Sequence, residues 1–316
     1  MKSFLEKIIH KQKKPLEAAP CECGILQKRL KEAEGELLRF KTRWAPGHYY
    51  SPVPNLEEVR EYEQKLDPAC PEIPGVDLNE KAQLQLLAEF EKLYHEQPFP
   101  DDKTPERRFY FKNDFFSYSD AIVLYSMMRY FRPSRIIEVG SGFSSCAMLD
   151  VDELFLDGKT EFHFIEPYPG HLLDRMPEAQ VKRMNILKQK FQTVDSSFFD
   201  RLEKNDFLFV DSSHVLKAGS DVMDLFFRVL PRLKPGVLIH FHDVIWPFEY
   251  FQKWLHAGYA WNEAYALRAF LQYNQAFEIV FFNTFLEQFY EKRFAEHMPL
   301  CLKDKGGSIW LRKKAV

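Results

Sequence analysis

Apolar and polar positions alternate in blocks over the last two thirds of the chain. Short runs that are apolar at consecutive positions are separated by longer segments with apolar residues at helical spacing. Strands covered by helices on both faces have this pattern, so the alternation predicts right-handed crossovers in a parallel sheet. The clearest runs end at Val139, Ile165, Val210 and Phe241, and a shorter one covers Ile186 and Leu187.

The segments between these runs predict helices over 144–154, 196–202 and 221–230. Two further apolar runs, 277–282 and 308–312, predict a closing pair of neighbouring strands, one of them reversed. No clear helical stripe lies between those two runs.

The region before the first run predicts two helices. Asp77 followed by Glu80 resembles a capping box and predicts an amphipathic helix that continues through Tyr94. Ser119 is the expected N-cap of a second helix, which Pro133 ends.

Composition divides the chain into three parts. Residues 1–45 are highly charged and predict a helical N-terminal arm, whereas residues 46–76 contain six prolines and predict an extended, largely irregular connector. Residues 77–316 form the expected catalytic domain, with its core at about 109–312.

Composition also excludes several classes of protein. An apolar content of 46% in 316 residues is enough for a buried core, and a net charge of −3 gives no field that favours nucleic acid. No run approaches the ~18 apolar residues that a transmembrane segment needs. The five cysteines are scattered and form no CxxC pair, so we expect reduced thiols and a cytoplasmic location.

A Gly-Ser-Gly turn follows the first apolar run, and an acid follows the second. Gly140 and Gly142, on either side of Ser141, would let a ligand approach the backbone. Glu166 would accept two hydrogen bonds from a ribose diol at the same edge of the sheet. This combination predicts a nucleoside site.

The turn also distinguishes between nucleoside cofactors. A dinucleotide fold would have a third glycine where this chain has Ser145, and Glu138 would repel a pyrophosphate. S-adenosylmethionine (SAM) carries no phosphate, and Glu138 could attract its ammonium group directly or through water. Asp195, after the short third run, is a further candidate at this edge. The residues therefore favour SAM.

Methyl transfer from a sulfonium requires an acceptor oxygen that is deprotonated by a general base or by a divalent cation. Asp211 and the pair His242 and Asp243 end two runs that we expect to be adjacent strands, so their side chains can converge on Mg²⁺. A histidine in the set would favour Mn²⁺, Fe²⁺ or Zn²⁺. His214, three residues after Asp211, is the expected general base.

An aromatic-rich segment follows Asp243 and is expected to contribute to an acceptor wall. Trp246 and Trp254 could stack on a sugar or an aromatic ring, and Glu249 and Glu263 could bind hydroxyl groups. The sequence leaves these alternatives open.

The stretches EVGSGFSS, FIEP, FLFVDSSHV, LPRLKPGVLIHFHDV and WNEAYALRAFLQYN together resemble class I SAM-dependent methyltransferases. They are similar in particular to a bacterial branch with catechol-O-methyltransferase-like sites, over about Phe109 to Arg312. The resemblance implies an α/β, Rossmann-like fold. It would have a seven-stranded, mostly parallel sheet, helices on both faces and an antiparallel last strand, after a helical N-terminal extension.

The resemblance also implies roles for single residues. Glu166 would hold the ribose, Gly140 and Gly142 would face the methionine part, and Asp195 would lie near the adenine. In the catechol-type family an aspartate after strand four and an Asp-Asn pair after strand five bind the metal. Asp211 matches the first, whereas His242 and Asp243 stand in place of the pair. His214 stands where that family has a lysine.

We therefore expect a SAM-dependent methyltransferase that acts on the oxygen of a small hydroxylated acceptor, glycosyl or phenolic. Asp211, His214 and His242 would be its catalytic residues, a divalent metal is an option, and a homodimer is left open. One alternative is a catalytically silent adenosyl-binding or scaffold protein that works through its N-terminal arm. Another, a nicotinamide-dependent oxidoreductase, is disfavoured by Glu138 and Ser145.

Overall fold

A computed structural model describes most of the chain and divides it into two compact units, Met1–Val59 and Arg60–Val316. The first unit contains α2 (Glu22–Arg39), and α3 (Leu56–Glu63) spans the boundary. The expected helix before residue 22 lies outside the described residues. These are 22–39, 44–67, 69–176, 181 and 184–315.

The second unit is built on a seven-stranded sheet in the order β3-β2-β1-β4-β5-β7-β6. Neighbours from β3 to β5 pair in parallel, whereas β7 is antiparallel to both β5 and β6. This confirms the expected α/β fold with a reversed last strand. The strands are β1 (Arg135–Val139), β2 (Glu161–Ile165), β3 (Asn185–Leu187), β4 (Phe207–Val210), β5 (Leu238–His242), β6 (Phe277–Phe282) and β7 (Ser308–Lys313).

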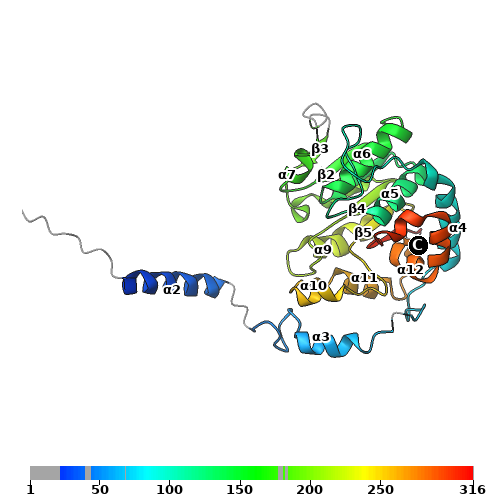
Figure 1. Cartoon of the computed structure of the whole chain (residues 1–316). Coiled ribbons are helices and arrows are strands. Elements are labelled where there is room, and N and C mark those ends of the chain that lie inside the picture. The colour runs from blue at the N-terminus through cyan, green and yellow to red at the C-terminus, as the bar shows by residue number, and fades with distance from the viewer. Residues whose placement is uncertain (1–21, 40–43, 68, 177–180, 182–183, 316) are drawn as a thin grey trace, which may run out of the picture. The chain divides into compact units, whose positions relative to one another are not determined.

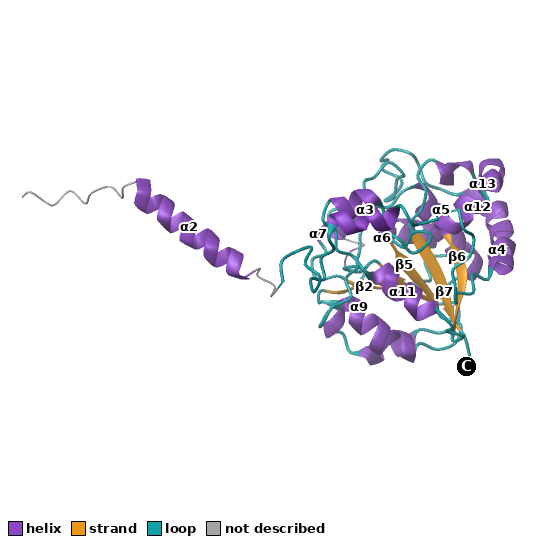
Figure 2. Ribbon diagram, turned by 90° about the horizontal axis from the view of Figure 1, so that it is seen from below, coloured by secondary structure: helices purple, strands orange, loops and turns teal. Residues whose placement is uncertain are grey.

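Helices cover both faces of the sheet (Figure 1; Figure 2), which explains why its central strands are apolar at consecutive positions. One layer holds α4 (Glu80–Leu93), α5 (Tyr118–Phe131), α6 (Phe143–Phe155) and α12 (Asn283–Phe289). The other holds α9 (Asp221–Asp224), the π-helical turn η4 (Leu225–Val229) and α11 (Glu263–Leu271).

Shorter elements complete the unit. They are η1 (Tyr94–Glu96), α7 (Gly170–Leu173), η2 (Phe191–Thr193), η3 (Ser196–Arg201), η5 (Leu230–Arg232), α10 (Gln252–His256), α13 (Glu291–His297) and η6 (Pro299–Leu302).

The sheet register brings the ends of the central strands to one edge. Val139 pairs with both Ile165 and Val210, and Val210 pairs with Phe241. The residues that follow these positions therefore emerge side by side. They are Gly140, Glu166, Asp211 and His242.

Two helix starts differ from the expected ones. α5 begins at Tyr118 after Ser117, because the Ser119 hydroxyl is buried and donates to the Glu287 carboxylate. α4 begins at Glu80 after Asn79, which adopts a left-handed conformation, and the Asp77 carboxylate accepts from the Asn79 amide at 2.9 Å. That contact organises a turn before the helix in place of a capping box.

Helices also occupy the segment between the last two strands, where no stripe was visible in the sequence. In α12 the residues 283–287 are all buried, including the polar Asn283, Thr284 and Glu287, so polar positions do not mark a solvent-exposed face there. The connector differs as well, because α3 forms within it and residues 60–76 belong to the larger unit. The Tyr62 hydroxyl donates to Glu249 at 2.7 Å, and the Tyr273 amide donates to the Gly75 carbonyl at 2.7 Å.

Candidate active site

The two glycines of the β1–α6 turn have different surroundings. Gly140 has a φ of +79°, and a Cβ there would lie 2.3 Å from the carbonyl oxygen of Asp211. Gly140 is therefore required by the close approach of the β1 and β4 ends, not by a ligand. Gly142 has an extended backbone, and a Cβ there would meet no atom within 4 Å, so this position faces open space.

Glu138 does not face that space. It is completely buried, and its two carboxylate oxygens accept hydrogen bonds from the Ser144 and Ser145 hydroxyls at 2.5 Å. Burial raises the pKa of Glu138 to about 8. Glu138 is not among the residues that line the two cavities described below. It joins the first turn of α6 to β1, so the expected attraction of a ligand ammonium is not supported.

A cavity of about 520 Å³ lies over the carboxyl ends of β1, β2 and β4. Glu166 lines this cavity, and one of its carboxylate oxygens accepts from the Tyr168 amide at 2.8 Å, which fixes the side chain. Lys190, Phe191 and Gln192 also line it, although they were not expected from the sequence. They follow β3 after Lys188 and Gln189, closer to the strand end than Asp195, the residue that the strand-end rule had selected.

Asp195 was the residue expected near an adenine, and the structure places it elsewhere. Its side chain is exposed and accepts from the Ser197 amide at 2.9 Å, which makes it the N-cap of η3. It does not line the cavity. The short β3 ends at Leu187, and the chain has already passed the sheet edge when it reaches Asp195.

A second cavity, of about 140 Å³, adjoins the glycine turn. Its lining includes Ser141, Gly142, Phe143, Arg175 and Asp211. The Ser141 hydroxyl oxygen is buried and has no hydrogen-bond partner among the described residues. The Arg175 guanidinium lies 4.3 Å from the Phe143 ring centroid. Because Asp211 lines both cavities, they meet at the end of β4.

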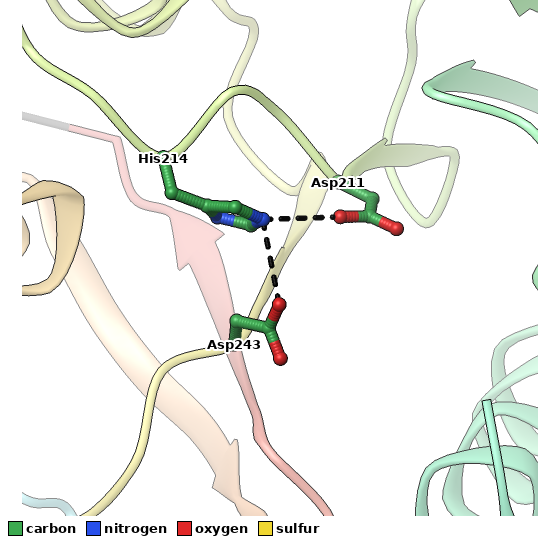
Figure 3. Close-up of side chains that lie close together, drawn as sticks. All are labelled: Asp211, His214 and Asp243. Carbon is green, nitrogen blue, oxygen red and sulfur yellow. Dashed lines mark ion pairs between the residues drawn. The ribbon is translucent and has the colours of Figure 1, made fainter. Parts of the chain in front are cut away.

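One group of side chains within the described parts of the chain could hold a metal ion. It consists of Asp211, His214 and Asp243, which lie close together (Figure 3). The Nε2 atom of His214 lies 3.4 Å from an oxygen of Asp211 and 3.4 Å from an oxygen of Asp243. One ligand atom from each residue lies within 4.8 Å of the other two. Two carboxylates and an imidazole are a suitable donor set for a divalent transition metal.

Glu263, at the start of α11, orients the imidazole. Its carboxylate lies 2.9 Å from Nδ1 of His214 and also accepts from the Ser212 hydroxyl at 3.0 Å. The His214 ring packs on Trp261, with centroids 4.4 Å apart. Glu263 thus keeps a proton on Nδ1 and turns Nε2 toward the two aspartates, as carboxylates behind metal-bound histidines do.

The charges in this group depend on each other. Burial would lower the pKa of His214, but its contacts with Asp211 and Glu263 raise it to about 10. Burial would raise the pKa of Asp211, but the hydrogen bond from His214 and the charge of His242 hold it below its usual range. At neutral pH the metal-free His214 is therefore an imidazolium and cannot accept a proton. This conflicts with the expected role of general base.

His242 is not part of this group, although it was expected as both a metal ligand and a catalytic residue. It is the last residue of β5, and its Nε2 lies 3.9 Å from Asp243. Its ring packs against Phe116, and its Nδ1 is buried without a partner among the described residues. The pKa of His242 is raised despite burial, because Asp243, Asp211 and Asp120 are nearby. His214 takes its place beside the two aspartates.

Most aromatic residues after Asp243 pack against each other. Trp246 is buried and contacts Phe285, with ring centroids 4.8 Å apart, so it is not available to an acceptor. Glu249 is buried and accepts from the Tyr62 hydroxyl. Trp254 is half-buried and contacts Trp261, 5.2 Å between centroids, next to His214.

Within the described residues, no helix combines the length and the apolar character required to cross a bilayer.

Residues 137–244 match a family model described as a methyltransferase domain. An uncharacterized protein of Archaeoglobus fulgidus is 38% identical over 166 residues, which cover 51% of this chain and 74% of that protein. The match to the family model contains the glycine turn, Glu166, Asp211, His214 and Asp243, but not Glu263.

Two solved structures are similar to the chain at low sequence identity. The Podospora anserina methyltransferase bound to S-adenosylhomocysteine has a TM-score of 0.42 at 15% identity, over 82% of this chain and 95% of that one. The Streptomyces achromogenes O-methyltransferase TomG, solved with SAM, has a TM-score of 0.40 at 15% identity, over 82% and 96%.

The family match covers the turn and the strand ends that form both cavities, and the sheet has the expected reversed last strand. Residues 137–244 therefore form a methyltransferase domain, and the chain is an enzyme with the Rossmann-like fold of class I, SAM-dependent methyltransferases.

Proposed function

We propose that this methyltransferase transfers the methyl group of SAM to an oxygen of a small hydroxylated acceptor, glycosyl or phenolic, with a divalent metal at Asp211, His214 and Asp243. The observation that carries the proposal is the convergence of these three side chains beside the cavities, with Glu263 behind the histidine. The resemblance to the catechol-type branch supports an oxygen acceptor.

The two cavities suggest how the cofactor is held. The nucleoside would occupy the larger cavity, where the oxygen of Glu166 that is not bound to Tyr168 can accept from the ribose diol. The methionine part would occupy the smaller cavity, with the unpartnered Ser141 hydroxyl and the Arg175 guanidinium near its polar groups. The reacting methyl group would then lie near Asp211, which both cavities share.

The donor set fits a divalent ion because Asp211, His214 and Asp243 present one ligand atom each. When bound, such an ion supplies positive charge that lowers the pKa of an acceptor hydroxyl and fixes its position. Glu263 would keep His214 in the tautomer that presents a neutral Nε2. The half-buried Trp254 and the adjoining Trp261 would exclude water from one side of the acceptor.

The test is a methylation assay with purified full-length protein, SAM and a panel of phenols, sugars and amines. We expect methylation of a hydroxyl compound, loss of activity after chelation, and recovery on adding Mg²⁺, Mn²⁺ or Zn²⁺. Asp243→Asn and Glu263→Gln should each lower the metal affinity about 10- to 100-fold, so a higher metal concentration should be needed for half-maximal activity. Asp195→Asn, outside the cavities, is the control and should behave as wild type.

Two outcomes would contradict this proposal. Methylation of amines only would exclude the oxygen acceptor. Full activity in chelator, together with an unaffected Asp243→Asn enzyme, would exclude the metal.

The expectation of a cytoplasmic location also remains a proposal. It is supported by the scattered cysteines, and Cys70, Cys146 and Cys301 are free thiols.

A further inference from the structure

α2 carries an apolar stripe along one side. Leu26, Leu30 and Ala33 recur at spacings of four and three residues, which is the a/d pattern of a coiled coil. Every residue from 24 to 35 is exposed, and Leu26 and Leu30 are 64% and 61% exposed. Exposed leucines repeated on one side of a helix indicate a surface that another helix covers.

Most of the other residues between 24 and 35 are polar or glycine, and Ile25, which is 45% exposed, is the apolar exception. Lys28, Lys31 and Glu32 lie away from the stripe, and Lys28 forms an ion pair with Glu32 at 3.9 Å. Gly24 and Gly35 also fall outside the stripe, so they do not interrupt it. The helix therefore has one apolar side and one solvated side.

We propose that α2 pairs in parallel with α2 of a second copy of this chain. Arg29 and Glu34 flank the stripe, at the g and e positions set by Leu30 and Ala33. In a parallel pair in register, a g residue faces the e residue five positions later on the other helix. Arg29 of each copy would therefore face Glu34 of the other, which forms two complementary pairs across the seam.

The same register places like residues opposite each other in the seam. Leu26 meets Leu26, and Leu30 meets Leu30. An antiparallel pair would place Leu30 opposite Ala33 and would leave Arg29 away from Glu34. Charge and core thus both favour the parallel arrangement.

The pairing is short, at about two heptads, and isolated helices of this length are marginal. We therefore expect a reversible dimer whose fraction rises with protein concentration. Its formation does not depend on the identity of the methyl acceptor or on a metal.

Cross-linking of the full-length protein tests the register. In a background with Cys21→Ser, Cys23→Ser and Cys70→Ser, the remaining Cys146 and Cys301 are buried. Ala33→Cys places a thiol in the seam, and mild oxidation should give a covalent dimer. Lys31→Cys, on the solvated side, is the matched control and should give no covalent dimer under the same oxidation.

Charge reversal provides a second, non-covalent test by sedimentation velocity over a concentration series. Arg29→Glu and Glu34→Arg should each lower the dimer fraction, and the double variant should restore it, because only the parallel register pairs these positions. A protein that is monomeric at all concentrations, or a dimer that the double variant fails to restore, would overturn the proposal. SAM binding should be the same in every variant, which separates this result from the proposed function.

Discussion

His214 and Asp243 both hold their backbone in the left-handed region, with φ of +57° and +56°. For residues with a Cβ this conformation costs on the order of 1 kcal/mol or more. The surrounding structure compensates at His214, whose carbonyl accepts from the Asn262 and Glu263 amides at 3.0 and 3.1 Å. The two turns direct side chains from β4 and β5 toward one point, which regular strand exits would not do.

Glu166 is the residue whose loss should affect the cofactor most directly. Glu166→Ala removes a charged acceptor, so SAM should bind about 10- to 100-fold more weakly, as measured by isothermal titration calorimetry. Asp195→Ala is the matched control, because that carboxylate caps η3 and should leave the affinity unchanged. Equal effects of the two substitutions would contradict the cavity assignment.

Glu138 should make the stability of the protein depend on pH. Its pKa is about 8 in the folded chain against an ordinary 4.5, so the folded state keeps a proton that the unfolded state has lost. The free energy of unfolding should therefore fall as pH rises from 4.5 toward about 8. Glu138→Gln should remove this part of the slope in urea unfolding without SAM.

Glu106→Gln changes an exposed acid and should leave the slope of wild type. An unchanged slope in Glu138→Gln would show that the Glu138 carboxyl ionises normally in the folded protein.

At the scale of single residues, the sequence predicted the positions at strand ends but not their partners. Glu166 and Asp211 directly follow β2 and β4, so their location follows from the topology alone. His214, and not His242, lies beside Asp211 and Asp243 because the backbone at His214 is left-handed, and the hydrophobic pattern of the sequence does not reveal such a turn. Glu263 lies on a helix far along the chain, and its contact with His214 appears only in three dimensions.

At the scale of elements, the two glycines of the β1–α6 turn should have different roles, Gly140 in stability and Gly142 in SAM binding. Gly140→Ala would push a Cβ against the Asp211 carbonyl in a left-handed backbone, so it should destabilise the fold by about 2 kcal/mol or more. Gly142→Ala meets open space and an extended backbone, so its thermal unfolding should stay close to wild type while SAM binding weakens. Thermal unfolding and calorimetry on both variants check this. If Gly142→Ala destabilised the fold and Gly140→Ala affected only SAM binding, the assignment of the cavity beside Gly142 to SAM would be wrong.

The strands β1, β2, β4 and β5 were the elements that the sequence predicted best, because each is mostly apolar on both faces and is followed by a Gly or an acid. β1, β2, β4 and β5 begin or end within one residue of the expected runs. Buried helices were harder, since the polar residues Asn283, Thr284 and Glu287 of α12 are themselves buried. Helix starts were displaced where a serine or an aspartate bonds to another partner, as at Ser119 and Asp77.

At the scale of the whole molecule, the larger unit should fold without the arm. A chain that begins at residue 56 keeps α3 and the Tyr62–Glu249 hydrogen bond, so its melting temperature and SAM affinity should match the full protein. A chain that begins at residue 80 also loses the Tyr273–Gly75 bond and the bond from the Asn79 side chain to the Ile279 carbonyl, and it should melt several degrees lower. Differential scanning calorimetry measures both; equal melting temperatures would contradict the assignment of residues 60–79 to this unit.

The position of Glu263 limits how enzymes with this architecture can diversify. The segment between β5 and β6 supplies both the packed pair Trp254 and Trp261 and the carboxylate that orients His214. If this segment were exchanged to change the substrate range, the orientation of His214, and with it the proposed metal site, would therefore change at the same time. Chimeras that carry a foreign segment should recover turnover only when they retain an acid at the start of its helix.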